Sequence, residues 1–222
     1  PPRSTLFPYT TLFRSKSLGL VSITGSIIGL TLALQLIPTL AKFGAESLIP
    51  SMLSIAILRE IGPVIISLIC AGKMGSAIGA ELGSMKVTEQ ISAMEVSAVN
   101  PFKYLVVTRV IATTLTVPIL VIYSNALSLL GGYFALSITS NIGIKLYFDS
   151  AISILGFSDI IPSTLKTAFF GFSIGIVGCF KGYNCARGTE SVGLAANSSV
   201  VLASLLVIIL DLIAVQISSL LF

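Results

Sequence analysis

Apolar residues along this chain fall into five long runs, which short polar segments separate. The runs cover about residues 18–40, 50–79, 103–137, 162–180 and 198–221. A helix needs about 20 apolar residues to cross a bilayer, and each run has about that length or more. The pattern predicts an all-α, polytopic membrane protein, with about five transmembrane helices in one membrane domain that covers residues 17–222.

Glycine recurs at one-turn spacing in three of these runs. The positions are Gly25 and Gly29, then Gly75, Gly79 and Gly83, and finally Gly171 and Gly175. This spacing lets a neighbouring helix backbone approach closely. We expect the middle set to be a helix-packing face, so that Gly79→Leu disrupts assembly and Gly79→Ala is tolerated.

The second run also carries an adjacent charged pair, Arg59 and Glu60, which Gly62 and Pro63 follow. A charge at bilayer depth costs at least about 2.5–3.5 kcal/mol and is by default a functional candidate. Pro63 removes a backbone donor and predicts a kink. Neighbours on a helix do not face one another, so each charge needs its own partner. The four residues are our candidates for a lipid headgroup or gating site, and a structural ion network is the alternative.

Two further expectations concern the interior of the bundle. We expect Leu58 and Ile66, on either side of the charged pair, to face a lipid cavity. Asp211 lies alone in the last apolar run. It is a candidate for a hydrogen bond across the bundle, and contact with a substrate is the alternative.

Residues 81–99, between the second and third runs, form an amphipathic stretch. Apolar side chains recur there at helical spacing, with polar side chains on the other face. Such a helix could lie on the membrane surface or dock on a partner in the aqueous phase. The candidate docking residues are Glu81, Lys86, Glu89, Gln90 and Met94.

Composition narrows the function classes further. Only 10% of the 222 residues are charged, against about 25% in a soluble domain. The formal charge is +4, but the cations are scattered, which excludes a nucleic-acid footprint. The sequence has no His, no CxxC spacing among its three Cys and no P-loop motif. We therefore expect no catalytic residue, no metal and no cofactor on this chain, and active transport would need ATP on a partner.

The beginning of the chain does not follow this pattern. The letters PPRSTLFPYTTLFRS have no helical period and resemble a translated sequencing adapter. We predict that residues 1–16 are a non-native segment and that the native N-terminus is missing.

Basic residues indicate an orientation. Six cations lie in the 73–109 connection and the 181–190 loop, and three (Lys42, Lys145 and Lys166) lie on the other side. The positive-inside rule then predicts that the first side is cytoplasmic.

The segments LREIGPV, AGKMGSAIGAELGSMKVTEQISAMEV and NPFKYLVVTR resemble the MlaE family of ABC-transporter permeases. The resemblance runs from about residue 18 to the C-terminus and includes GYNCARGTESVG and Asp211. It implies a homodimeric permease in the bacterial inner membrane, with an ABC ATPase and an MCE-domain lipid-binding protein as partners and phospholipid as substrate. It also implies that the stretch from Glu81 to Met94 is a cytoplasmic coupling helix that docks on the ATPase.

Two other function classes remain possible from the residues alone. A polar pair beside a broken helix also suits a secondary transporter or channel, although the two halves show no inverted repeat. An intramembrane enzyme is a weaker alternative, because the sequence offers neither His nor a paired-Asp arrangement.

Overall fold

The computed structural model describes residues 7–140, 142–186 and 188–221, and every regular element in them is helical. Five helical segments are long and apolar enough to cross a membrane. They are Leu18–Lys42, Glu46–Val87, Phe102–Ser140, Asp159–Tyr183 and Thr189–Leu220. The predicted all-α architecture with five spans is therefore confirmed. Helix α1 (Phe7–Lys42) already includes part of the segment that we predicted to be non-native, and residues 1–6 lie outside the described residues.

The second span is one continuous helical rod built from several pieces. Its elements are η1 (Glu46–Leu48), α2 (Ile49–Ala56), η2 (Ile57–Ile61), α3 (Gly62–Cys70), η3 (Ala71–Gly75) and α4 (Ser76–Val87). Both η2 and η3 are π-helical turns. The Gly62 N–H bonds to the Ile57 carbonyl, five residues back. A π turn, a feature often found at functional sites, thus directly precedes Gly62 and Pro63, and the kink at Pro63 stays a prediction.

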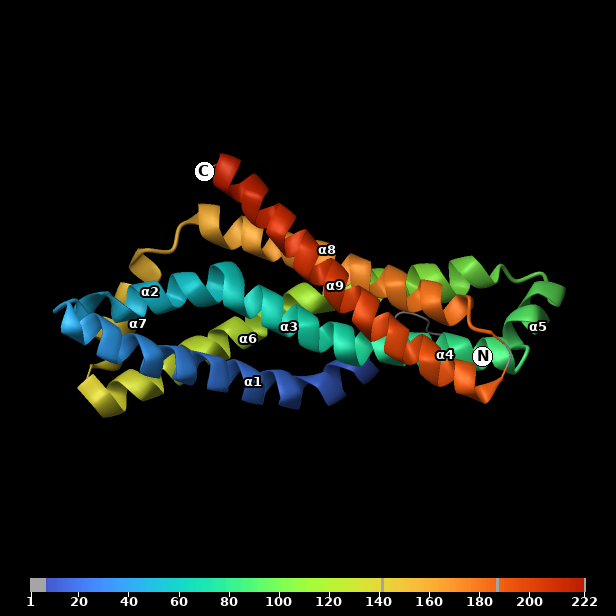
Figure 1. The fold of residues 1–222 in the computed structure, drawn as a ribbon, viewed down its shortest axis with the longest axis horizontal. Coiled ribbons are helices and arrows are strands. Elements are labelled where there is room, and N and C mark those ends of the chain that lie inside the picture. The colour runs from blue at the N-terminus through green and yellow to red at the C-terminus, as the bar shows by residue number, and fades with distance from the viewer. Residues whose placement is uncertain (1–6, 141, 187, 222) are drawn as a thin grey trace.

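The remaining elements form an elongated bundle with a short helix at each end (Figure 1). They are α5 (Gln90–Val96), the π-helical η4 (Phe102–Val107), α6 (Thr108–Ser140), α7 (Ile144–Ser153), α8 (Phe157–Tyr183) and α9 (Thr189–Leu221). Helix α5 lies at one end of the bundle and α7 at the other, while α1 and α6 run side by side (Figure 1). Buried apolar side chains form a cluster at each end and a central one around Phe170.

Small residues decide which helices pack closely. A Cβ on Gly25 would stand 2.5 Å from the Ser124 hydroxyl of α6, and the Ser128 hydroxyl donates a hydrogen bond of 2.8 Å to the Gly25 carbonyl. Nearer the start of α6, a Cβ on Gly171 would lie 2.6 Å from the Thr113 carbonyl. The glycine pairs in the first and fourth spans therefore both allow close packing against α6. Their spacing predicted such a close approach of a neighbouring helix.

The middle glycine set is less uniform than its spacing suggests. A Cβ on Gly79 would stand 2.5 Å from the Ser199 hydroxyl and 3.2 Å from the Ala195 carbonyl, both on α9. A Cβ on Gly75 would meet nothing closer than 3.8 Å, and one on Gly83 nothing closer than 3.4 Å. Of these three positions, Gly79 alone has a close approach of α9 to its Cβ direction. The tolerance of Gly79→Ala stays a prediction, and the structure gives a reason to expect a cost at this position.

The amphipathic stretch 81–99 is two helices and not one. Helix α4 carries the chain to Val87, and α5 begins at Gln90 after Glu89, which adopts a left-handed conformation with φ of 58°. Ala98, just beyond α5, has the same φ of 58°. Two non-glycine residues in the left-handed conformation, which is costly for residues with a side chain, thus lie on either side of α5. They separate this helix from both neighbouring spans.

Candidate functional site

A cluster of five charged side chains joins three spans in the half of the bundle that contains α7. Its centre is Lys166 on α8, whose ammonium donates to Glu60 Oε2 at 2.8 Å and to Asp211 Oδ1 at 2.9 Å. The Lys166 side chain is only 8% exposed. Asp211 therefore makes the hydrogen bond across the bundle that we predicted, and Lys166 links η2 to α9.

Arg59 and Asp159 complete this charged cluster, hereafter the five residues Arg59, Glu60, Asp159, Lys166 and Asp211. An Arg59 nitrogen lies 3.9 Å from Asp159 Oδ1. Arg59 and Glu60 thus have different partners, as expected for neighbours on a helix. The first turn of α8 fixes Asp159, because its carboxylate accepts a hydrogen bond of 3.2 Å from the Gly156 N–H. A carboxylate at this position also suits the positive end of the helix dipole.

Two cavities meet at the charged cluster. A recess of about 30 Å³ is lined by Arg59, Glu60, Asp159 and Lys166, with Pro162, Ser163, Ala214, Val215 and Ser218. An apolar groove of about 400 Å³ runs between α8 and α9, and its lining includes Leu165, Phe169 and Ile213. Pro162, Lys166, Ala214 and Ser218 line both spaces. The arrangement joins a small charged recess to an elongated hydrophobic surface.

The structure places the other candidates of the second span in packing positions. A Cβ on Gly62 would collide with the Asn125 side chain of α6, so Gly62 permits that close contact. Pro63 is buried. Ile66 is 0% exposed and belongs to the central core, so our expectation that it faces a lipid cavity is wrong. Leu58 packs against the apolar cluster at the α7 end.

A second ion pair lies in the half of the bundle that contains α5. Arg109 on α6 is 1% exposed, and its Nη2 lies 2.9 Å from Glu81 Oε1 on α4. Its Nη1 also donates to the Leu105 carbonyl at 2.8 Å. Glu81 thus joins the second span to the third and does not lie on α5. Arg109 and Lys166 are both buried in the bundle, so neither should be counted as a loop cation. Without them, five cations lie on the side predicted to be cytoplasmic and two on the opposite side, and the predicted orientation is unchanged.

The remaining docking candidates lie around α5. Lys86 ends α4 with its ammonium 5.3 Å from the centre of the Tyr183 ring. Glu89 and Gln90 are exposed, and Met94 packs partly against the core cluster that contains the buried Ile91. Val96 is 90% exposed. Helix α5 is anchored on one side and presents a mixed polar and apolar surface on the other.

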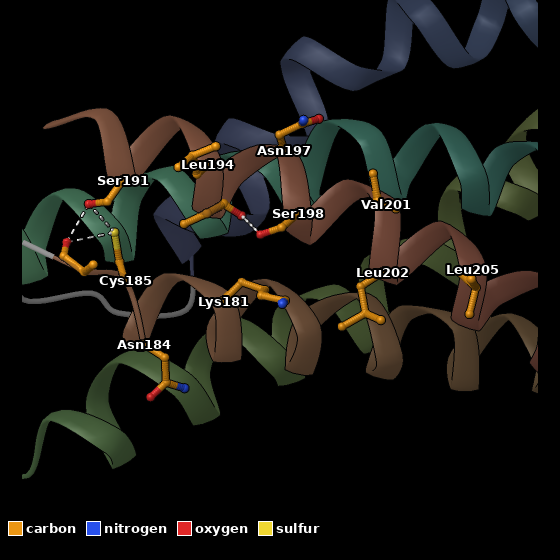
Figure 2. A pocket seen from close by; sticks show the side chains of 12 residues that line it. Lys181, Asn184, Cys185, Ser191, Leu194, Asn197, Ser198, Val201, Leu202 and Leu205 are labelled. Atoms are coloured by element: carbon orange, nitrogen blue, oxygen red, sulfur yellow. Dashed lines mark hydrogen bonds between the residues drawn. The ribbon is translucent and has the colours of Figure 1, made fainter. Parts of the chain in front are cut away.

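Figure 2 shows a third cavity, of about 680 Å³, where the end of α8, the connecting loop and the start of α9 meet. The Cys185 thiol lies 3.1 Å from the Ser191 hydroxyl at one end of it. Lys181, Asn197 and Leu205 also line it. No residue of the charged cluster reaches this space, and it adds no charged partner to the candidate site.

Sequence reasoning missed Lys166, Asp159 and Arg109 as site residues. Lys166 and Arg109 were counted as loop cations, although both lie within or next to apolar runs. The available signal was charge balance, because an acidic residue such as Asp211 in an apolar span calls for a basic partner in another span.

Comparison with known proteins agrees with this architecture. The family described as Permease MlaE matches residues 10–217. A probable ABC transporter permease protein of Rickettsia typhi is 38% identical over 193 residues, which are 87% of this chain and 74% of that protein. The intermembrane phospholipid transport system permease protein MlaE of Haemophilus influenzae is 33% identical over 199 residues, covering 89% and 76% of the two chains.

A plant protein is also similar. The chloroplastic protein TRIGALACTOSYLDIACYLGLYCEROL 1 of Arabidopsis thaliana is 32% identical over 198 residues, 89% of this chain and 57% of the plant protein. The family match covers nearly the whole chain and begins within α1, eight residues before the first apolar run at Leu18. The chain therefore belongs to the MlaE family of ABC-transporter permeases, the multi-pass and non-catalytic transmembrane subunits of these transporters.

Proposed function

We propose that this permease moves phospholipid between the bacterial inner membrane and another membrane, driven by ATP hydrolysis on a separate ABC ATPase. An MCE-domain lipid-binding protein on the opposite side and a second copy of this chain would complete the transporter. The relative from Haemophilus influenzae, which is named as the permease protein of an intermembrane phospholipid transport system, supports this substrate class.

The observation that carries the proposal is the junction of the charged recess with the apolar groove. A phospholipid has the same division, with a charged headgroup on two apolar chains. Arg59 is 44% exposed at the recess, and its planar guanidinium can donate two parallel hydrogen bonds to a phosphate. Phe169, 57% exposed, and Ile213, 45% exposed, line the groove where acyl chains would lie.

Helix α5 supplies the coupling surface in this proposal. The helix lies between the second and third spans in the chain. The buried Ile91 packs it against the bundle, and Val96 and Gln90 are exposed. The polar and apolar side chains on this exposed side of α5 offer a surface on which a protein in the aqueous phase could dock. We assign this surface to the ATPase and the α5 end of the bundle to the cytoplasm.

Lipid capture tests the function directly. A photoreactive amino acid replaces Phe169 in the groove or, as the control, Ile23 on the outer face of α1, which is 63% exposed. The complex with its ATPase is irradiated after stepwise dilution of membrane lipid with detergent. We expect position 169 to retain covalently bound phospholipid after position 23 has lost it. Equal loss at both positions would mean that the groove only contacts bulk lipid.

A further inference from the structure

We propose that the charged cluster selects phospholipids whose headgroup carries a primary ammonium beside the phosphate, over headgroups that are net anionic or quaternary. The inference rests on the proposed lipid function and assigns the headgroup class to the same site. The charges, the accessible groups and the hydrogen bonds that each kind of headgroup can donate support it.

The charge balance of the cluster disfavours a purely anionic ligand. Arg59 and Lys166 supply two positive charges, and Glu60, Asp159 and Asp211 supply three negative ones, a formal net charge of −1. A phosphate alone would add a second uncompensated negative charge inside an apolar bundle, where uncompensated charge is costly. A zwitterionic headgroup leaves the balance unchanged.

The two cations are not equally available to a ligand. Lys166 is committed to two carboxylates at 2.8 and 2.9 Å and is 8% exposed. Arg59 is 44% exposed, and its 3.9 Å separation from Asp159 exceeds hydrogen-bond distance. The phosphate therefore belongs on Arg59.

Carboxylate oxygens next to Arg59 are placed for an ammonium. Glu60 is 39% exposed, lines the recess and accepts from Lys166 through Oε2. Asp159 is 26% exposed and lines the same recess. An ammonium has three N–H donors and no acceptor, so it complements two carboxylates directly.

Hydrogen bonding distinguishes primary from quaternary ammonium at this recess. A primary ammonium has three N–H donors for the carboxylates that line it. A trimethylammonium group has no N–H to donate.

The test is a competition between three lipids in one sample. Phosphatidylethanolamine, phosphatidylcholine and phosphatidylglycerol, with identical diazirine-bearing acyl chains, are mixed in equal amounts with the complex in detergent. Mass spectrometry reads the label on the peptide that contains Phe169, with the α1 peptide that contains Ile23 as the bulk reference. We expect phosphatidylethanolamine to exceed each competitor at Phe169 by about threefold, the scale of a partly exposed ion pair, and to show no excess at Ile23.

Variants assign the preference to the cluster. Asp159→Asn brings the formal charge to zero and should reduce the ethanolamine-to-glycerol ratio toward that of the reference peptide. Asp149→Asn removes the same charge from exposed α7 and should leave the ratio unchanged. Because each ratio is measured within one sample, a lower yield of folded protein does not alter it.

The outcomes separate this inference from the proposed function. Equal labelling of Phe169 by all three lipids, lost in Arg59→Gln, would overturn the headgroup preference and leave the lipid site in place. A ratio that survives Asp159→Asn would also overturn it. Labelling at Phe169 no stronger than at Ile23 for any lipid would remove the lipid site itself.

Discussion

Substituting Gly79 and Gly75 by alanine compares two glycines one helical turn apart that differ in their surroundings. At Gly79 the new methyl would stand 2.5 Å from the Ser199 hydroxyl, 3.2 Å from the Ala195 carbonyl and 3.3 Å from Ala196 Cα. At Gly75 the nearest atom would lie at 3.8 Å, an ordinary contact. Gly79→Ala should therefore weaken the contact between α4 and α9, whereas Gly75→Ala should not.

The size of the difference follows from two opposing effects. Both substitutions gain helix propensity, up to about 1 kcal/mol. Only Gly79→Ala also overpacks a helix contact, which costs about 1–3 kcal/mol, and two of the three close atoms at this site belong to the backbone and cannot rotate away. We expect Gly75→Ala to be neutral or slightly stabilising, and Gly79→Ala to be less stable than it by about 1–3 kcal/mol.

Equilibrium unfolding of the purified variants in detergent measures this difference, and size-exclusion profiles report assembly. Ser199→Ala combined with Gly79→Ala is the internal check, because it removes the atom at 2.5 Å and leaves the 3.2 Å contact with the Ala195 carbonyl. The double variant should recover part of the loss. Equal stability of Gly75→Ala and Gly79→Ala would refute the close approach of α9 at this point.

Two further predictions concern the ends of the bundle. The buried Tyr147 hydroxyl on α7 donates to the Leu129 carbonyl at 2.9 Å, so Tyr147→Phe should cost about 0.5–1.5 kcal/mol of unfolding free energy at pH 8. Burial raises the pKa of Tyr147 to about 12, above the unfolded value of about 10. The wild type should therefore lose more stability than Tyr147→Phe between pH 10 and 12, and a gap between the two proteins that is constant with pH would contradict this. At the α5 end, Glu81→Gln should cost about 3 kcal/mol, the lower end for a broken buried pair, because Glu81 is 41% exposed while Arg109 is 1% exposed. Adding Arg109→Met should recover part of that loss in thermal unfolding, and no recovery would mean that Arg109 is stabilised mainly by other groups.

The spans could be predicted because bilayer crossing imposes a requirement that each segment meets by itself. Five apolar runs of sufficient length are enough to predict five spans. The glycine pairs that begin at Gly25 and Gly171 indicated close helix packing, but they did not indicate which helix would be the partner. The separate partners of Arg59 and Glu60 also followed from local geometry, since neighbours on a helix diverge.

The partners themselves could not be predicted from local geometry. Lys166 is 106 residues from Glu60 and 45 from Asp211 in sequence, and only the packing of α8 against both η2 and α9 brings them together. The break at Glu89 is hidden for another reason. A glutamate in the left-handed conformation leaves no mark in the sequence, so the hydrophobic rhythm continues across a point where the chain changes direction.

The π turns in the second span are points at which its length can change without turning the helices on either side. An α-helix advances about 100° per residue, and each π turn accommodates about one residue more than an α turn would. Removing a single residue between Ile57 and Ile61 would therefore leave an ordinary α turn and keep the faces of α2 and α3 in register. The same removal within α3 would rotate everything before it by about 100° and turn the charged pair away from α8.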